Sequence, residues 1–426
     1  MDNIETLFNT LLPDRVPFRE RKSSDEKILT PPKIAKEMVE ALPDEVWNSH
    51  TTFLDPTCKS GIFLYEIYKK LMESEEVIKE YPDRKERHFH IINSQLYGIA
   101  LDETCQFISM RTAYGQLKPD SHIISLSDYM AMVKNPDRTF LYEALKKEFN
   151  TVKFDVVIGN PPYNNDIYLD FVQVGHKLSN KYSCWITPAK WQAKGGAKNE
   201  QFRKDIVPYM EKIVYYPYTK DVFDVTVGGG ITFYIIDNNR KLNQKQILEI
   251  KSIDKRVIFK NEITCRDENR KTYFNDIYEN IVKKVIDKRQ ALTIGNYKEA
   301  PCYVEVSHLS ADKDKSNCMG GLITTPFYKS NSISCIQNIH TIFSGTEGQC
   351  DSFISFVNTK TVRFLLMLSL YVPITNNICW RFVPKPEAFD HIFTDAELYE
   401  KYNLTQEEIN IIESLIKERK KLYAVP

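Results

Sequence analysis

The chain has 426 residues, with 57 Lys and Arg against 57 Asp and Glu, and 42% of its residues are hydrophobic. This length is too great for one small core and predicts two domains. The zero net charge gives no general indication of a polyanionic partner, and the apolar and charged fractions are typical of a globular chain rather than a disordered one.

After an irregular lead-in over about the first 25 residues, strand and helix patterns alternate up to residue 236. Thr30 is expected to cap a helix with Pro31 and Pro32 in its first turn. Strands are predicted near 52–55, 91–99, 122–126, 154–159, 183–187, 212–216 and 231–236, and helices near 62–72, 103–115, 167–179 and 199–211. This alternation predicts an α/β sheet with helices on both faces.

After about residue 245 the pattern becomes shorter and more irregular, which predicts domains at 1–245 and 246–426. Between Arg240 and Glu299, 15 Lys and Arg face 9 Asp and Glu, as in a phosphate-binding surface or a solvated, linker-rich region. The longest apolar run, residues 364–372, predicts a buried helix. Thr394–Glu397 and Thr405–Glu408 are expected to be capping boxes that start the last helices.

The nine cysteines are scattered and odd in number, and no two form a C-x-x-C pair. This argues against a zinc site and a disulfide framework, and we expect no metal and a reducing cytoplasm. No charged leader and no run long enough to cross a bilayer is seen, so no membrane partner is expected. The spacing of His88 and His90 would put them on one face of a strand, but an exposed pair on a charged segment is the favoured interpretation.

The tetrapeptide Asn160-Pro161-Pro162-Tyr163 is the most informative motif, and it follows the β-branched run 154–159. In an open α/β sheet, ligands bind at the carboxyl ends of the strands. The Asn160 side-chain oxygen and the Pro161 carbonyl suit accepting the hydrogens of a planar exocyclic amine, while Pro162 stiffens the turn and Tyr163 offers a stacking face. The alternative is an ordinary strand-to-loop turn, because Asn-Pro is a common turn pair.

Residues 52–65 have the layout of a strand, a tight turn and a helix. Asp55 and Pro56 end the strand, and Ser60 and Gly61 stand where the backbone turns closely. Such a turn after the first strand of a doubly wound sheet cradles a nucleotide-like cofactor, although an ordinary βα loop looks similar. The pairing with the later tetrapeptide, in this order, makes the interpretation specific.

Asp55-Pro56-Thr57-Cys58-Lys59-Ser60-Gly61 resembles motif I of S-adenosylmethionine-dependent amino-methyltransferases, and the tetrapeptide at 160–163 resembles their motif IV. Thr30-Pro31-Pro32-Lys33 resembles motif X, which precedes motif I. This order, followed by a long C-terminal region, resembles the γ class of N6-adenine DNA methyltransferases of restriction–modification systems. Residues 182–191 and 221–236 resemble the far wall of the target pocket, and the resemblance covers roughly residues 25–245.

The resemblance implies an α/β, Rossmann-like class I methyltransferase domain with a mixed, mostly parallel sheet, and a C-terminal α+β target-recognition domain that ends in helices. It implies methyl transfer from S-adenosyl-L-methionine to the N6 of a flipped adenine in double-stranded DNA, with Asn160 to Tyr163 as catalytic residues. A restriction nuclease encoded separately is a further partner to expect. Trp191, Phe233 and Tyr234 would contact the substrate. The implied cofactor-binding residues are Thr30, Pro31, Asp55, Pro56, Thr57, Ser60, Gly61, Asp102 and Asp128.

Two positions depart from the family pattern. Lys59 stands where the family usually has Gly, and Ala100 stands where it normally places an acid that holds the ribose hydroxyls. Asp102 or Glu103 takes that role, or it is unfilled. Asp128 would accept the cofactor adenine amino group by resemblance, and its alternative is a helix N-cap in a surface loop.

Other functions stay open at this point. The same tetrapeptide serves methyltransferases of structured RNA and of protein glutamine, although the large C-terminal domain argues against glutamine. A fused nuclease is not expected, because no Pro-Asp…Asp/Glu-x-Lys cluster is convincing and the motifs begin near the N-terminus. A non-catalytic DNA-binding subunit that kept the fold is the third alternative, which Lys59 and Ala100 favour and the intact tetrapeptide opposes.

Overall fold

The computed structural model describes residues 28–115, 121–192, 196–216, 219, 222–223, 227, 230–240, 246–251, 257–263, 276–286, 291–294, 299–306, 327–333, 339–369 and 380–416. The chain divides into two compact units. The first is Met1–Thr187, Asp205–Ile213 and Phe233–Gln244, and the second is Pro188–Lys204, Val214–Thr232 and Lys245–Pro426. The predicted lead-in and parts of segment 221–236, of stretch 240–299 and of the last helix lie outside the described residues.

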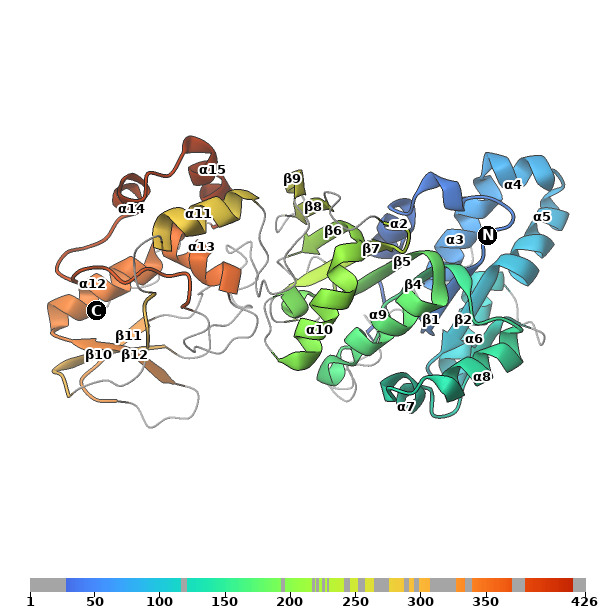
Figure 1. The fold of residues 1–426 in the computed structure, drawn as a ribbon, viewed down its shortest axis with the longest axis horizontal. Helices are drawn as coiled ribbons and strands as arrows, with labels where there is room; N and C mark the ends of the chain where they lie inside the picture. Colours follow the sequence, from blue (N-terminus) through green and yellow to red (C-terminus); the bar gives the residue numbers. More distant parts are fainter. Residues whose placement is uncertain are drawn as a thin grey trace. The chain divides into compact units, whose positions relative to one another are not determined.

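A nine-stranded sheet has the order β3-β2-β1-β4-β5-β7-β6-β8-β9 (Figure 1). Its strands are β1 (Phe53–Cys58), β2 (Leu96–Ala100), β3 (Ile123–Ser125), β4 (Phe154–Gly159), β5 (Ser179–Pro188), β6 (Met210–Tyr216), β7 (Ile231–Asp237), β8 (Gln246–Lys251) and β9 (Val257–Ile263). β1 pairs in parallel with β2 and β4, β2 with β3, and β4 with β5, while β8 and β9 are antiparallel. The predicted Rossmann-like α/β fold with a mixed, mostly parallel sheet is therefore confirmed.

Helices connect the parallel strands. The α-helices are α2 (Pro32–Glu40), α3 (Ile62–Glu73), α4 (Glu75–Glu80), α5 (Arg84–His90), α6 (Glu103–Tyr114), α7 (Tyr129–Lys134), α8 (Thr139–Phe149), α9 (Ile167–Leu178) and α10 (Ala197–Ile206). Short 3₁₀ and π turns are η4 (Asp44–Val46), η5 (Ile91–Gln95), η6 (Asn164–Asp166), η7 (Ala189–Gln192) and η8 (Val207–Tyr209). Helices α2, α3 and α6 pack together, and α7, α8 and α9 form a second group. Because crossovers are right-handed and the strand order reverses after β3, the two groups cover opposite faces of the sheet.

Close packing of helix on sheet explains one glycine of the core. Trp185 of β5 is fully buried, and Gly175 of α9 lies directly against its ring. A Cβ atom at Gly175 would stand 2.0 Å from the Trp185 ring, so no other residue fits there without moving the helix.

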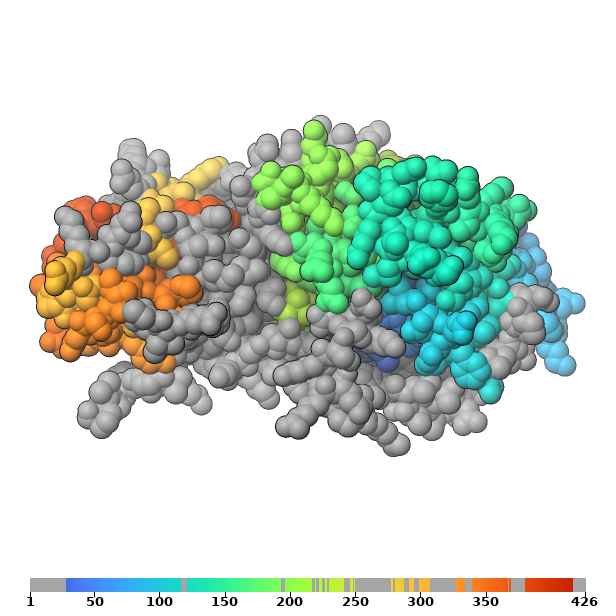
Figure 2. Space-filling view, turned by 90° about the horizontal axis from the view of Figure 1, so that it is seen from below, coloured from blue at the N-terminus to red at the C-terminus, as the bar shows by residue number. Residues whose placement is uncertain are grey.

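On the outside of the first unit, the teal segment that contains α7 and α8 forms part of the surface (Figure 2).

Most predicted strands and helices of the first unit are confirmed within a few residues, but the strand expected at 91–99 begins only at Leu96. Residues 84–95 are helical instead, as α5 and the π turn η5. A shared strand face for His88 and His90 is therefore excluded, and the favoured interpretation as an exposed pair is wrong, because both side chains are partly buried. Both lie on α5, where His88 Nδ1 is 2.9 Å from the Tyr68 hydroxyl and His90 Nε2 is 2.8 Å from the Ser49 carbonyl.

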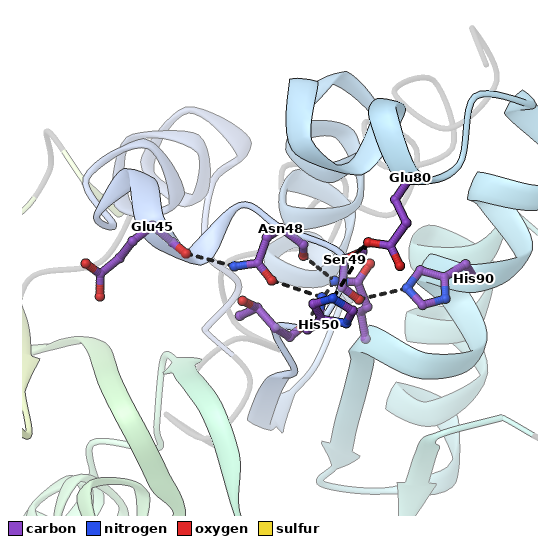
Figure 3. Close-up of polar contacts among 8 residues, drawn as sticks. Glu45, Asn48, Ser49, His50, Glu80 and His90 are labelled. Atoms are coloured by element: carbon purple, nitrogen blue, oxygen red, sulfur yellow. Dashed lines mark hydrogen bonds and ion pairs between the residues drawn. The ribbon is translucent and has the colours of Figure 1, made fainter.

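The turn that leads into β1 is held by a polar network (Figure 3). Asn48 Nδ2 donates to the Glu45 carbonyl at 2.8 Å, and its Oδ1 accepts from the His50 backbone N–H at 2.9 Å. Gln95 Nε2 donates to the carbonyls of Asn48 and Thr51, at 2.8 and 2.9 Å. These bonds satisfy backbone carbonyls of an irregular segment and fix where β1 starts.

From residue 276 onwards, the described residues form the three-stranded antiparallel sheet β11-β10-β12 and five α-helices, which agrees with the predicted α+β architecture. The elements are β10 (Cys302–Val306), β11 (Phe327–Ser330), β12 (His340–Gly345), α11 (Asp276–Ile286), α12 (Glu347–Asn358), α13 (Lys360–Ser369), α14 (Asp395–Lys401) and α15 (Gln406–Leu415). Phe353 stacks on Phe343 with centroids 4.5 Å apart and meets Phe389 edge-on. These aromatic contacts join sheet and helices into one core.

The expected starts of the last two helices have different geometries. Thr405 and Glu408 form the full capping box of α15, as predicted. Thr394 caps α14 by accepting from the Glu397 N–H, but the Glu397 carboxylate lies 3.0 Å from His391 Nε2. The apolar run predicted as a buried helix is α13 as far as Ser369.

Candidate active site at the ends of β1 and β4

The carboxyl ends of β1 and β4 lie side by side at the point where the strand order reverses. Phe53 pairs with Val156 and Leu54 with Val157 in a parallel register, so both strands end at the same edge of the sheet. The two motifs singled out in the sequence follow these strands directly. A reversal of strand order is where an open α/β sheet leaves room for a ligand.

Thr57 joins the two motifs through its hydroxyl. Asp55 Oδ1 accepts from the Thr57 backbone N–H at 2.9 Å and from the Thr57 hydroxyl at 3.2 Å. The Thr57 oxygen in turn accepts from the Asn160 backbone N–H at 3.1 Å. Gly159 allows this approach, because a Cβ atom there would lie 2.6 Å from Thr57 Oγ1. The hydroxyl therefore fixes the first residue of the tetrapeptide against the β1 loop.

Asp55 carries a carboxyl group in a fully enclosed position. Burial raises its pKa to about 6, and the Thr57 hydrogen bonds and the positive charge of Lys59 partly oppose this rise. Burial thus makes the charged carboxylate costly in free energy. The carboxylate accepts its hydrogen bonds from Thr57, in the segment that leads into the loop after β1.

Asn160 is the central side chain of the site and is 2% exposed. Its Nδ2 donates to Thr30 Oγ1 at 3.0 Å and to the Ile28 carbonyl at 3.4 Å. Its Oδ1 is buried and has no hydrogen-bond partner in the part of the chain that the structure describes. A desolvated amide oxygen without a donor costs about 1–3 kcal/mol, so this atom is prepared to accept a hydrogen bond from a ligand.

Tyr163 is buried at the end of the tetrapeptide, and its ring meets Tyr168 edge-on at 6.4 Å. Burial raises the pKa of Tyr163 well above its usual value, and the nearby Tyr234 raises it further. Tyr234 of β7 accepts from the Thr187 hydroxyl at 3.4 Å, and its own pKa is also raised by burial. Both phenols are therefore neutral, so they offer aromatic faces rather than a base.

Alternation along β7 separates the two aromatic residues predicted for the far wall. Successive side chains of a strand point to opposite faces, so Phe233 lies on the face of β7 away from Tyr234. Both are fully buried. Tyr234 lies near enough to Tyr163 to raise the pKa of that phenol, so Tyr234 is on the same side of the sheet as the tetrapeptide.

The loop after β1 makes a tight turn at Gly61. Its φ of +74° is a left-handed conformation, and a Cβ atom would lie 2.7 Å from the Ser109 carbonyl oxygen of α6. Glycine is thus required both for the backbone angle and for the close approach of α6. The neighbouring Pro56 carbonyl accepts from the Tyr129 hydroxyl at 2.8 Å, which ties the loop after β3 to the same turn.

Two carboxylates predicted to hold the cofactor lie after β2 and β3. Asp102 caps α6, since its Oδ1 accepts from the Cys105 N–H at 2.7 Å. Asp128 precedes α7 with a φ of 58°, is exposed and makes no side-chain capping bond. Asp128 is thus the N-cap residue of α7 by position, as the alternative expected, and its carbonyl accepts the first backbone bonds of the helix while its carboxylate makes no capping bond. The ligand roles of both residues stay predictions.

Thr30 lies in the candidate site but not as the expected helix cap, and Trp191 lies in the second unit. Thr30 does not cap α2, because the helix starts at Pro32 with Pro31 as its N-cap and without a side-chain bond. The Thr30 hydroxyl meets Asn160 instead. Trp191 belongs to the second unit, where its carbonyl accepts from Arg203 Nη1 at 2.6 Å. Its predicted contact with the substrate stays a prediction.

Sequence reasoning missed two features of this edge. The Ile28 carbonyl accepts hydrogen bonds from both Asn160 Nδ2 and Lys59 Nζ. This backbone carbonyl is therefore part of the site, although no sequence motif includes Ile28. Asn165 and Asp166 both have left-handed backbones directly after the tetrapeptide. The run Asn164-Asn165-Asp166 was the available signal, since Asn and Asp tolerate this conformation best among residues with a side chain.

Comparison with known proteins agrees with this geometry. The Eco57I restriction-modification methylase family matches residues 94–165 and 163–223. The chain is similar to restriction–modification methyltransferases. It is also 25% identical over 344 residues to an uncharacterized adenine-specific methylase of Mycoplasma pneumoniae, covering 60% of this chain and 80% of that protein. The resemblance to adenine methyltransferases of restriction–modification systems, predicted from the motifs, is confirmed by these two matches.

Solved structures give weaker likenesses. A modification subunit of a putative type I restriction enzyme from Vibrio vulnificus YJ016 has a TM-score of 0.40 and 14% identity, over 58% of this chain and 50% of that one. The EcoKI M protein has a TM-score of 0.40 and 13% identity, over 76% and 68%. The chain spans about half the length of the first two modification subunits that it matches. The fold assignment rests on the strand order, since these scores are low.

Two further properties concern the described residues only. None of their helices combines the length and apolar character that a membrane span requires. Within the same residues, no group of three or more His, Cys, Asp or Glu side chains is arranged to hold a metal ion.

Proposed function

We propose that this protein is an S-adenosylmethionine-dependent methyltransferase that modifies the N6 of adenine in DNA at a specific duplex site. The observation that carries the proposal is the buried, unpartnered Asn160 Oδ1 at the carboxyl end of β4. An exocyclic amine is the group that would satisfy it, because its hydrogens are donors and its nitrogen can be methylated. The similarity to restriction–modification and adenine-specific methylases supports this choice of amine.

The mechanism follows from the fixed acceptors. Asn160 Oδ1 and the Pro161 carbonyl accept the two N6 hydrogens, and the amine nitrogen is drawn from planar towards tetrahedral geometry. Its lone pair, otherwise delocalised into the ring, then becomes available as a nucleophile. S-adenosylmethionine, when bound, would supply the methyl group: the N6–methyl bond would form as the sulfur–methyl bond breaks. S-adenosylhomocysteine would leave, and one N6 proton would then pass to solvent. Acceptors that are held before the reaction need no reorganisation during it, which is how the site lowers the barrier.

The flipped base would be held by aromatic faces. Tyr163 is neutral and buried beside Asn160, so it suits stacking on the adenine ring, while Pro162 stiffens the turn. Tyr234, which lies near Tyr163, is the better candidate of the β7 pair for the second face. Extruding the base costs a few kcal/mol, which such stacking contacts offset.

The cofactor would bind across the ends of β1, β2 and β3. Gly61 and the bonds of Thr57 hold the β1 loop in the tight turn that a nucleotide-like cofactor needs. Asp128 is exposed and suits accepting the adenine amino group, and the half-buried Asp102 at the end of β2 is the proposed residue for the ribose hydroxyls. Thr30, Pro31, Pro56 and Ser60 complete the proposed cofactor residues.

The region 246–426 is proposed as the target-recognition domain. The catalytic motifs all precede it, and sequence readout needs side chains for base edges as well as for phosphates. Double-stranded DNA is the partner that follows, with a separately encoded nuclease as a second. We place the protein in the cytoplasm, where both would be found.

The direct test is transfer of a radiolabelled methyl group from S-adenosylmethionine to duplex DNA by the purified protein. After digestion of the DNA, label in N6-methyladenosine would support the proposal. The Asn160→Ala variant should bind cofactor and transfer label about 10²–10³-fold more slowly. Equal transfer by that variant would contradict the mechanism, and label in structured RNA but not in DNA would contradict the substrate.

A further inference from the structure

We infer that Lys59 is a positioning residue for Asn160 and acts through the backbone carbonyl of Ile28. This inference rests on the proposed function of Asn160. Lys59 directly follows β1, in the loop that turns at Gly61. It lies buried in the candidate site, where an ammonium group is expensive to place without a purpose.

The geometry links the two side chains at one oxygen atom. Lys59 Nζ donates to the Ile28 carbonyl at 3.2 Å, and Asn160 Nδ2 donates to the same carbonyl at 3.4 Å. A carbonyl oxygen has two lone pairs and can accept both bonds. The ammonium group therefore holds in place the acceptor that Asn160 uses.

The Ile28 carbonyl decides which end of the Asn160 amide faces the substrate. The Thr30 hydroxyl, 3.0 Å from Asn160 Nδ2, can donate or accept, so it would tolerate either orientation of the amide. A backbone carbonyl only accepts, so it requires the NH₂ group on its side. Asn160 Oδ1 is thereby directed away from residues 28–30 and presented as the unpartnered acceptor.

A flipped amide would remove the proposed chemistry. Oδ1 would then face the Ile28 oxygen, placing two acceptors together, and Nδ2 would point its hydrogens at the amine of the substrate. Lys59 raises the cost of the flipped state. Its hydrogen bond holds the Ile28 carbonyl in place, so that the carbonyl keeps a lone pair directed at Asn160. The positive charge of Lys59 also acts on Asp55, so one side chain influences both motif loops.

The test compares Lys59→Met with Lys36→Met. Methionine keeps an unbranched apolar chain but removes the charge and the donors. Lys36 is an exposed lysine on α2 that pairs with Glu40, so its replacement serves as the matched control. Lys59→Gly removes the whole side chain and serves as a second variant. Single-turnover methyl transfer is measured at saturating DNA and cofactor, and cofactor affinity is measured separately.

We expect both Lys59 variants to transfer the methyl group about tenfold more slowly, as for loss of one hydrogen bond from a charged group, with cofactor affinity changed far less. The Lys36 control should match the unmodified protein. Unchanged transfer would overturn the inference. An equal loss of transfer rate and cofactor affinity would also overturn it, since Lys59 would then act on the cofactor.

A second readout does not need activity. NMR of Asn-labelled protein measures hydrogen exchange of the Asn160 side-chain NH₂, which should be protected in the unmodified protein and exposed in Lys59→Met. If the unmodified protein methylates no DNA but protection is lost in the variant, the proposed function fails and the positioning role stands. If protection is unchanged in the variant, the positioning role fails whatever the substrate.

Discussion

Two parts of the carboxyl edge of the parallel sheet differ in how far their polar side chains are held by the protein itself. At the ends of β1 and β4, Asp55, Thr57 and Asn160 are buried and bonded to one another, and one acceptor is left open. At the ends of β2 and β3, Asp102 is half-buried and caps a helix, while Asp128 is exposed. Under the proposed function, the first part holds an acceptor ready for the transition state, and the second presents two carboxylates to the cofactor.

The largest effect should come from the open acceptor itself. Asn160→Ala removes Oδ1, and we expect methyl transfer to fall by about 10²–10³-fold, as for loss of one group that stabilises a transition state. Single-turnover kinetics at saturating substrates would measure this. Asp128→Ala should instead weaken cofactor binding and leave transfer at saturation nearly intact. The same kinetic signature in both variants would remove the contrast between the two parts of the edge.

The buried carboxyl of Asp55 should make stability depend on pH. Its pKa is raised from 3.8 to about 6, so the folded protein binds its proton more tightly than the unfolded chain does. The stability that this proton contributes is complete below pH 4 and is lost as the pH rises to about 6, a change on the order of 3 kcal/mol. Asp55→Asn should remove this dependence and be the more stable protein at pH 7 in urea unfolding.

The matched control is Asp137→Asn, because Asp137 is exposed and its pKa is lowered by hydrogen bonds from Thr139. Its contribution has the opposite sign, since it is present at neutral pH and lost as the pH falls. A parallel pH dependence in the unmodified protein and in Asp55→Asn would show that Asp55 is not the group responsible.

The tight turn at Gly61 should cost somewhat less to disturb. Gly61→Ala adds a Cβ atom 2.7 Å from the Ser109 carbonyl oxygen and strains a left-handed backbone, so we expect a loss of about 2 kcal/mol in the free energy of unfolding. Gly348→Ala is the control, because no atom lies within 4 Å of its Cβ position on α12. That change should be neutral or stabilising, and equal losses at both sites would contradict the packing argument.

The smallest effect should come from Thr30. Thr30→Val removes one bond to Asn160 Nδ2 while Ile28 still holds the amide, so transfer should slow only about threefold to tenfold. Thr30→Ser keeps the hydroxyl and should be close to the unmodified protein. A loss as large as that of Asn160→Ala would show that the hydroxyl, and not the carbonyl, orients the amide.

The core of the fold could be predicted because its signals are local. The β-branched residues of 154–159 correctly predict a strand, and the spacing of apolar residues after Gly61 correctly predicts a helix. The segment 84–95 was misread, because its apolar end looks like a strand while contacts of His88 and His90 with distant residues support a helical course. Tertiary contacts decide such ambiguous segments, and single-sequence patterns do not contain them.

The candidate site was predicted in its residue types but not in its connections. Asn160 and Asp55 were named from motifs, yet no pattern places the Ile28 carbonyl between Lys59 and Asn160. Backbone groups carry no sequence signature, and Thr30 looked like a helix cap because Thr often precedes a proline-led helix. Its observed role depends on a contact between residues 130 positions apart.

The central claim is best tested by single-molecule long-read sequencing of DNA from cells that express the chain or its Asn160→Ala variant. We predict N6-methyladenine at one short sequence motif with the unmodified chain, and far less with the variant. Absence of a methylated motif in both samples, with both proteins present and folded, would contradict the claim that this site methylates adenine in DNA.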